Sequence, residues 1–143
     1  MKRRITSFLL MSFILTVMCI PAFANSESWS FVMDYRVVNG KDNGQIHAMD
    51  SGNMVINGDI WTYSKDPGSL DSPNKVYVYV YQDVFGPDRK VGYTTVTPYS
   101  ELNSPKSFSK GFGFQNSGDY YLVIAKSNDD GYNLKGEGTL TTN

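Results

Sequence analysis

The sequence has few of the residues on which disulfide-stabilised domains and metal sites depend. The 143 residues include one cysteine, Cys19, and one histidine, His47. A single cysteine cannot form an intramolecular disulfide, although small secreted domains commonly rely on such bonds. A zinc site is disfavoured as well, because its usual ligands are Cys and His. The chain must therefore fold by packing alone.

Recognisable catalytic motifs are also missing. His47, Asp50 and Ser51 lie close together in the sequence, but a catalytic triad is assembled in space beside an oxyanion hole. The chain has no Gly-x-Ser-x-Gly motif for a nucleophile. We therefore interpret His47 as a turn-adjacent histidine near solvent and expect the protein not to be an enzyme.

Positive charge is scarce after the first few residues. Three of the 13 Lys and Arg residues lie in residues 1–24, whereas all 14 Asp and Glu residues lie beyond them. Such an acidic chain with scattered basic residues is a poor candidate for binding nucleic acid. It also has no Asn-x-Ser/Thr glycosylation site, which fits a bacterial secreted protein better than a eukaryotic one.

The N-terminal segment has the features of a signal peptide. A basic start, Met1-Lys2-Arg3-Arg4, precedes an apolar run from Phe8 to Ile20, and Ala22-Phe23-Ala24 follows. The apolar run is shorter than the ~20 residues that a membrane-spanning helix needs. We expect residues 1–24 to be a signal peptide that is cleaved before Asn25, which makes the protein secreted and extracellular.

Lipidation at Cys19 is the alternative to simple cleavage. The preceding residues are Thr16-Val17-Met18, whereas a lipid-attachment motif would have Leu first and a small residue last. We therefore expect no stable membrane anchor, and Cys19 leaves with the signal peptide.

Residues 25–143 have the composition of one β-rich domain. They contain two alanines and five leucines against eleven valines and 17 aromatic residues, and valine and aromatic residues suit a half-buried sheet. Short alternating runs separated by turns predict an all-β fold, an antiparallel β-sandwich of jelly-roll or immunoglobulin-like type with seven or eight strands.

The alternation places the strands approximately. Within the first, residues 29–37, the odd positions Trp29, Phe31, Met33, Tyr35 and Val37 are expected to face the core. Gly58, in the middle of the run 54–63, suggests a bulge or a close backbone contact. Further strands are expected at 46–49, 76–81 (continuing to 85), 91–97, 108–114, 120–126 and 134–141, with a loop at 66–74.

The most suggestive candidate site is in residues 76–81, where Tyr77, Tyr79 and Tyr81 alternate with valines. With the valines in the core, the tyrosines would form a row ~13–14 Å long at ~3.4 Å per residue. Trp61 and Tyr63 share a parity on the preceding strand and are expected to widen this aromatic platform. Such a surface suits sugars and apolar ligands.

Two other interpretations of residues 76–81 remain open. A continuous apolar run is typical of a central strand that is buried on both faces. The run is also uncharged and free of Pro and Gly, which is the composition of a self-assembling segment. If it formed an edge strand, assembly into a fibre would be expected.

A calcium site is the remaining candidate. One loop supplies four residues with oxygen ligands: Asn128, Asp129, Asp130 and Asn133. Asp119, Asp66 or Asp71 could join them if the loops meet, since Ca²⁺ takes 6–8 oxygens. The alternative is that Asn-Asp-Asp-Gly is only a hairpin turn. No other cofactor is indicated.

Together these features predict a secreted, non-catalytic binding or interaction module, which contacts an extracellular polymer, peptide or protein through an aromatic strand face or through loops. The alternative is a structural subunit of a matrix or fibre, or a small membrane-active toxin. The sequence leaves the oligomeric state undetermined.

Overall fold

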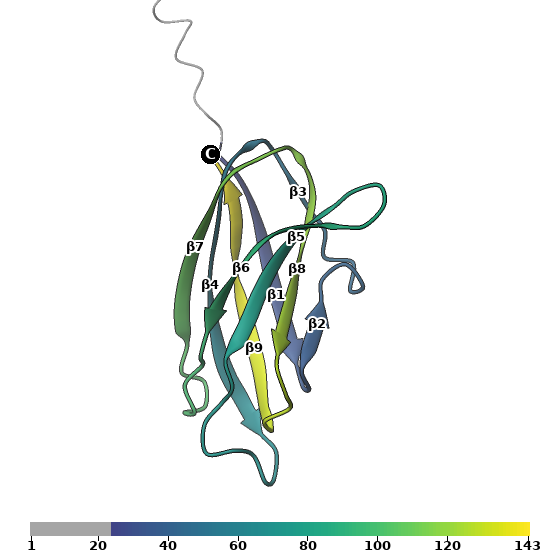
Figure 1. Ribbon diagram of the computed structural model, residues 1–143. Coiled ribbons are helices and arrows are strands. Elements are labelled where there is room, and N and C mark those ends of the chain that lie inside the picture. The colour runs from purple at the N-terminus through teal and green to yellow at the C-terminus, as the bar shows by residue number, and fades with distance from the viewer. Residues whose placement is uncertain (1–23) are drawn as a thin grey trace, which may run out of the picture.

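Two antiparallel sheets packed face to face make up the fold (Figure 1). The computed structural model describes residues 24–143. The signal peptide predicted for residues 1–24 therefore lies outside the described residues, apart from Ala24. Within residues 24–143, no helix has the length and apolar character that a membrane span requires.

Sheet A has four strands and sheet B has five. The order in sheet A is β1 (Asn25–Met33), β9 (Tyr132–Thr142), β4 (Gly52–Lys65) and β7 (Lys106–Gln115). The order in sheet B is β2 (Val37–Asn39), β8 (Gly118–Lys126), β5 (Val76–Asp83) and β6 (Arg89–Val96), and β3 (His47–Met49) also pairs with β8. The predicted all-β sandwich is confirmed.

The core lies between the sheets and follows the period-2 alternation of the strands. In β5, Val76, Val78 and Val80 are fully buried, as expected when alternate side chains of a strand face the core. Sheet A contributes large apolar residues opposite them, including Met54, Ile56 and Ile60 of β4, Leu134 and Leu140 of β9, and Trp29, Phe31 and Met33 of β1.

The prediction of one strand over residues 29–37 is wrong at its C-terminal end. β1 ends at Met33, the chain bends through residues 34–36, and β2 joins the other sheet, where Val37 pairs with Ala125. Because the bend interrupts the alternation, Tyr35 and Val37 are exposed rather than in the core.

The close backbone contact predicted at Gly58 is present. A Cβ atom at Gly58 would lie 2.2 Å from Cζ2 of the Trp29 ring, and one at Gly138 would lie 2.6 Å from the same atom. The indole therefore lies against the backbone of β4 and β9, which only glycine permits. The bulges of β4 lie elsewhere, between Met54 and Val55 and between Thr62 and Ser64.

A buried ion pair closes the turn that leads from sheet B into sheet A. Lys126, at the end of β8, donates to Asp130 at 2.5 Å and to the carbonyl of Tyr132, the first residue of β9, at 2.8 Å. Both charged side chains are fully buried. The pair fixes the path of the chain between the two sheets.

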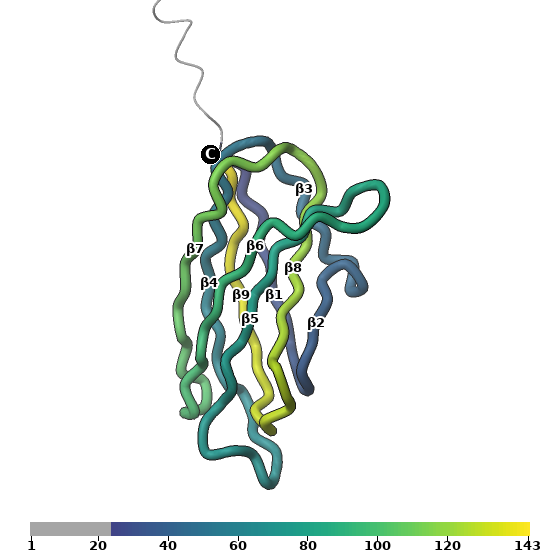
Figure 2. The backbone as a smooth tube through the Cα atoms, viewed as in Figure 1, coloured from purple at the N-terminus to yellow at the C-terminus, as the bar shows by residue number. Residues whose placement is uncertain are grey.

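The first and last described strands lie side by side. Asn25 at the start of β1 pairs with Thr142 at the end of β9, so residue 25 and the C-terminus lie at the same end of the sandwich (Figures 1 and 2).

Candidate functional site

The three tyrosines predicted in residues 76–81 lie on the outer face of sheet B. The valines of β5 face the core, and Tyr77, Tyr79 and Tyr81 point the other way and are partly exposed. The alternative of a strand buried on both faces is therefore wrong. The strand ends at Asp83 rather than at Phe85.

Neighbouring strands add two more tyrosines, which the sequence analysis missed. In the strand register, Tyr93 of β6 lies opposite Tyr79, and Tyr121 of β8 lies opposite Tyr81. The term tyrosine face is used below for these five residues: Tyr77, Tyr79, Tyr81, Tyr93 and Tyr121. Pairing across strands determines this set, and pairing is not visible in one strand's alternation.

The rings of the tyrosine face pack against one another. Ring centroids lie 6.0 Å apart for Tyr77 and Tyr79, and 5.5 Å apart for Tyr79 and Tyr93. Tyr81 stacks on Tyr121 at 5.5 Å. The Lys90 ammonium lies 4.5 Å from the centroid of Tyr79 and 4.9 Å from that of Tyr93, which is within cation–π range. The rings of Tyr77, Tyr79, Tyr81 and Tyr93 therefore form one continuous, partly exposed surface with Lys90 on it. Tyr121 completes the cluster from below, because it is only 5% exposed and Lys41 lies 5.6 Å from its ring centroid.

The residues around the tyrosine face extend its apolar character. Val123 and Ala125 of β8 pair with Tyr79 and Tyr77, and Val37 of β2 pairs with Ala125. Val37 is 52% exposed and Tyr93 is 49% exposed. An outward sheet face normally carries polar residues, so this face is unusually apolar for an antiparallel sheet.

A charged network borders the tyrosine face at one end. Asp88 accepts hydrogen bonds from the Tyr121 hydroxyl at 2.8 Å and from Lys41 at 3.0 Å, and these bonds lower the pKa of Asp88. Lys41 also donates to Asp83, and both carboxylates raise the pKa of Lys41. Burial and the bond to Asp88 raise the pKa of Tyr121 to about 12.

Burial also affects the central ring of the face. It raises the pKa of Tyr79, and the neighbouring tyrosines add to the increase. The hydroxyls of Tyr79 and Tyr121 are therefore neutral hydrogen-bonding groups at physiological pH.

The expectation that Trp61 and Tyr63 widen the aromatic platform is wrong. Both lie in β4, on the outer face of sheet A, which is the opposite side of the sandwich. The loop between β4 and β5 carries the chain from one sheet to the other, so equal parity on consecutive strands does not place residues on one surface.

Residues 76–81 do not form an edge strand. β5 pairs with β8 on one side and with β6 on the other. Both of its backbone edges are therefore hydrogen-bonded, and fibre formation through this segment would require unfolding of the sheet.

His47 is not near solvent as predicted, because it lies in β3 and is only 5% exposed. Burial lowers its pKa, and the nearby charge of Glu27 opposes this effect. Within residues 24–143, no side-chain hydrogen bond joins His47 to Asp50 or Ser51. The three residues are therefore not assembled as a triad.

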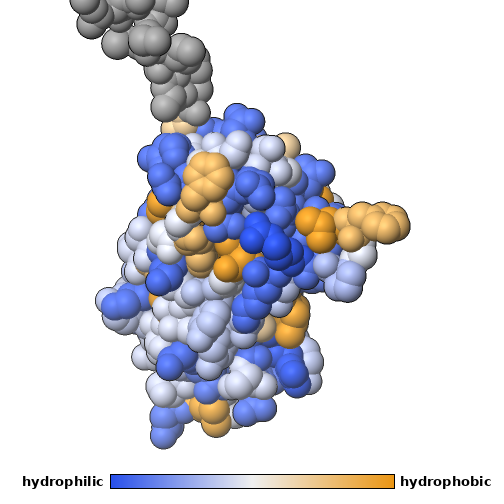
Figure 3. Space-filling view, turned by 45° about the horizontal axis from the view of Figure 1, so that its top comes forward, coloured by the Kyte–Doolittle hydropathy of each residue, from blue (hydrophilic) through white to orange (hydrophobic). Residues whose placement is uncertain are grey.

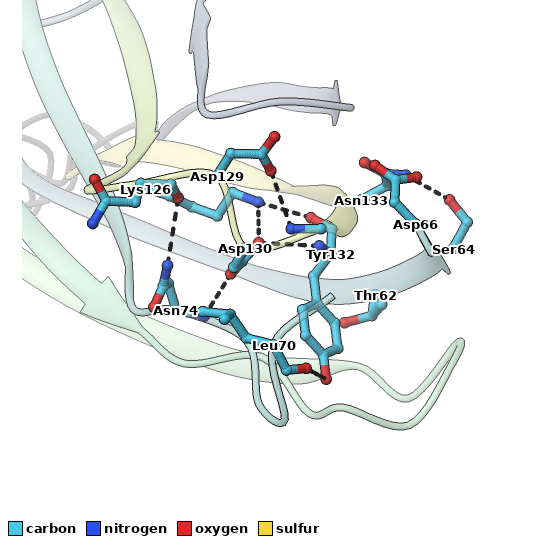
Figure 4. A network of polar contacts seen from close by, with 12 residues as sticks. Thr62, Ser64, Asp66, Leu70, Asn74, Lys126, Asp129, Asp130, Tyr132 and Asn133 are labelled. Carbon is cyan, nitrogen blue, oxygen red and sulfur yellow. Dashed lines mark hydrogen bonds and ion pairs between the residues drawn. The ribbon is translucent and has the colours of Figure 1, made fainter. Parts of the chain in front are cut away.

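The residues predicted to bind calcium do not form one site. Asp119 lies near the start of β8, whereas Asn128, Asp129 and Asp130 follow its far end. Asp130 is paired with Lys126 and accepts the backbone N–H groups of Asn74 and Tyr132 (Figure 4). The described residues contain no group of three His, Cys, Asp or Glu side chains placed to hold a metal.

The loop between β5 and β6 projects from the body of the sandwich with apolar side chains at its tip (Figure 3). Phe85 is fully exposed there and Val84 is 37% exposed. Gly86 follows with a φ of 99°, a conformation that glycine adopts readily. This exposed phenylalanine is a further candidate contact residue.

No family model matches the sequence, and no curated protein matches it either. Among solved structures, the chain is similar to the Cowpea mosaic virus top component of naturally occurring empty particles, with 14% identity and a TM-score of 0.42 over 86% of this chain and 77% of that one. A Cowpea mosaic virus empty virus-like particle matches with 13% identity and a TM-score of 0.40, over 83% and 72% of the two chains. A family two carbohydrate esterase from Cellvibrio japonicus matches with 11% identity and a TM-score of 0.29, over 82% of this chain and 33% of the esterase.

Proposed function

We propose that this chain is a secreted, non-catalytic binding module that docks its tyrosine face on the flat surface of an insoluble extracellular polysaccharide. The observation that carries the proposal is the outer face of sheet B, where four accessible tyrosines, Tyr77, Tyr79, Tyr81 and Tyr93, and several small apolar residues occupy positions that a solvated sheet gives to polar groups. The signal peptide predicted for residues 1–24 supports the extracellular location.

The composition of the face favours a polysaccharide surface over a charged partner. Lys90 is the one charged side chain among the cross-strand rows that carry Tyr77, Tyr79 and Tyr81. Tyrosine rings bury a large apolar area while their hydroxyls remain available for hydrogen bonds, which suits the mixed apolar and hydroxylated faces of sugar rings. The rings of Tyr77, Tyr79, Tyr81 and Tyr93 come from two adjacent strands, and such a broad cluster matches an extended polymer surface better than a single flexible chain.

Co-sedimentation with microcrystalline cellulose, chitin and isolated cell-wall polysaccharide tests the proposal. The protein exported by a bacterial host is expected to sediment with at least one of these polymers. Replacing both rings in a Tyr79→Ala/Tyr93→Ala variant should weaken binding by at least roughly thirtyfold, since truncating a central aromatic contact costs about 2 kcal/mol or more.

Tyr99→Ala is the matched control. Tyr99 is 46% exposed, close to the 49% of Tyr93, but it contacts Thr62 of β4 and Lys106 of β7, in sheet A. Binding by Tyr99→Ala should equal that of the unaltered protein, and all variants should unfold at similar temperatures. Absence of binding to every polymer, or equal losses in both variants, would contradict the proposed function.

A further inference from the structure

The outer face of sheet A is hollowed by a groove of about 810 Å³. The groove crosses all four strands of the sheet. Two cross-strand rows of outward-pointing residues form its floor, and the groove above these rows is called the polar groove. The first row is Ser28, Thr139 and Asn57, and the second is Ser30, Glu137, Asp59 and Ser107.

Small side chains leave a depression in the outer surface of sheet A here, and larger side chains border it at one end. The next row along the strands contains Val32, Lys135 and Trp61. These three residues line an adjoining hollow of about 300 Å³, which shares Ser30 and Glu137 with the polar groove. The two hollows therefore form a trough that ends at an aromatic ring.

The charges in the polar groove are not balanced within the protein. Asp59 and Glu137 lie directly opposite each other on β4 and β9, and like charges in such positions are destabilising. Within residues 24–143 neither carboxylate forms a salt bridge. The neighbouring Lys135 ammonium instead lies 4.6 Å from the Tyr63 ring centroid. Within the described residues this carboxylate pair has no cation partner, so it is open to a ligand.

The hydrogen-bonding groups of the groove are largely unused. Ser107 donates to Asp59 at 2.5 Å, which orients that carboxylate. Hydroxyl, amide and carboxylate groups arranged in rows can accept from and donate to the hydroxyls of a polyhydroxylated ligand. Small-ligand sites fix the orientation of the ligand with a few precisely placed polar groups beside apolar or aromatic side chains.

We propose that the polar groove binds a single sugar chain that carries no negative charge, either neutral or amino-substituted. Asp59 and Glu137 accept hydrogen bonds from sugar hydroxyl or ammonium groups, and Trp61 packs against a ring at the end of the trough. Uronic acid and sulfated chains are excluded because the carboxylate pair repels them. This site goes beyond the proposed function, since it lies on the opposite face from the tyrosines.

Calorimetric titration of the exported protein with soluble oligosaccharides tests the proposal. The probes are cello-oligosaccharides, mannan and galactan oligosaccharides, glucosamine oligomers and oligogalacturonate. Binding is expected for at least one neutral or amino-substituted chain and at least tenfold weaker for oligogalacturonate. Trp61→Ala should weaken binding about tenfold or more, as loss of an aromatic contact does. An Asp59→Asn/Glu137→Gln variant should lose the discrimination against oligogalacturonate.

Two controls separate this site from the tyrosine face and from general charge effects. Tyr79→Ala/Tyr93→Ala should leave oligosaccharide binding within twofold while it abolishes sedimentation with insoluble polymer. Glu101→Gln, an exposed carboxylate in the loop between β6 and β7, should change neither. Tighter binding of oligogalacturonate than of every neutral or amino-substituted chain, no binding of any chain, or unchanged binding by the groove variants would overturn the proposal.

Discussion

The outer faces of the two sheets differ in the side chains that their strands turn away from the shared core. Sheet B presents Tyr77, Tyr79 and Tyr93 beside small apolar residues. Sheet A presents rows of serine, asparagine, threonine and carboxylate side chains, with Trp61 and Tyr63 at one end of β4. A polar outer face is ordinary for an antiparallel sheet, and an aromatic one is not.

This difference teaches that the core and the outer faces are independent in such a fold. Most inward positions of both sheets are apolar and form one buried cluster, so stability comes largely from residues that neither outer face uses. Variants that unfold the shared core should therefore affect both faces together, and variants that disturb only the strands of one sheet should affect the face of that sheet alone.

The largest expected effect is the loss of stability when the buried ion pair between Lys126 and Asp130 is broken. Lys126→Met leaves Asp130 buried and without its cation, so the free energy of unfolding should fall by roughly 3–5 kcal/mol. Denaturant unfolding followed by intrinsic fluorescence measures it. Binding by both faces should be lost together at the denaturant concentration where the variant unfolds.

Asp129→Asn is the control for this prediction, because Asp129 is an exposed neighbour that accepts only the Gly131 N–H. Its free energy of unfolding should stay within about 0.5 kcal/mol of the unaltered value. A Lys126→Met variant as stable as Asp129→Asn would show that the ion pair does not hold the sheets.

A smaller loss of stability is expected from Gly138→Ala, and among the two outer faces it should affect only that of sheet A. The added Cβ would lie 2.0 Å from the Asn57 carbonyl and 2.6 Å from the Trp29 ring. Such overpacking should cost about 3 kcal/mol of unfolding free energy. It should also weaken oligosaccharide binding in the groove, because the strands that form its floor must move apart.

The matched substitution is Gly111→Ala in β7, where an added Cβ meets nothing within 4 Å. Thermal unfolding of the two variants should separate them clearly, with Gly111→Ala close to the unaltered protein. In the folded Gly138→Ala variant, sedimentation through the tyrosine face should persist. Equal loss of both binding activities would contradict the independence of the faces.

The smallest expected effect is the loss of stability at high pH when the Tyr121 hydroxyl, at the border of the tyrosine face, ionises. The folded-state pKa of Tyr121, about 12, lies above the ordinary tyrosine value of about 10. The stability linked to its protonated hydroxyl is therefore fully present below pH 10 and is lost as the pH rises towards 12. Tyrosinate absorbance during alkaline titration should show a late step that Tyr121→Phe removes.

Asp88→Asn provides the complementary measurement. Removing the carboxylate charge beside the hydroxyl should shift this late step to lower pH, although burial of Tyr121 remains. A late step that is unchanged in both variants would assign the raised pKa to another tyrosine.

The alternation of residues 76–81 predicts that the valines share one side of β5 and the tyrosines the other. It does not decide whether the tyrosine side is exposed or buried, because a strand buried on both faces has the same pattern. The contact at Gly58 was also predictable, since a glycine inside a strand signals close packing. The sheet to which each strand belongs could not be predicted in this way. Odd and even positions define the two faces of one strand, but they do not say which sheet the strand joins. That is why Trp61 was assigned to the wrong surface.

The polar groove left a signal in the sequence that could have been used. In each of four strands, one polar residue precedes and one follows a residue that faces inward or is glycine. The pairs are Ser28 and Ser30, Asn57 and Asp59, Ser107 and Ser109, and Glu137 and Thr139. Each pair alone is typical of any solvated strand. Only the register of four strands brings them into rows, and long-range pairing is not contained in local pattern.

The pairing of Asn25 with Thr142 has a practical consequence for how the molecule can be held. Since both ends of the domain emerge beside each other at one pole of the sandwich, a tether on either terminus leaves both broad faces uncovered. A molecule immobilised in this way keeps the outer faces of sheet A and sheet B accessible at the same time, so each can be probed without releasing the other.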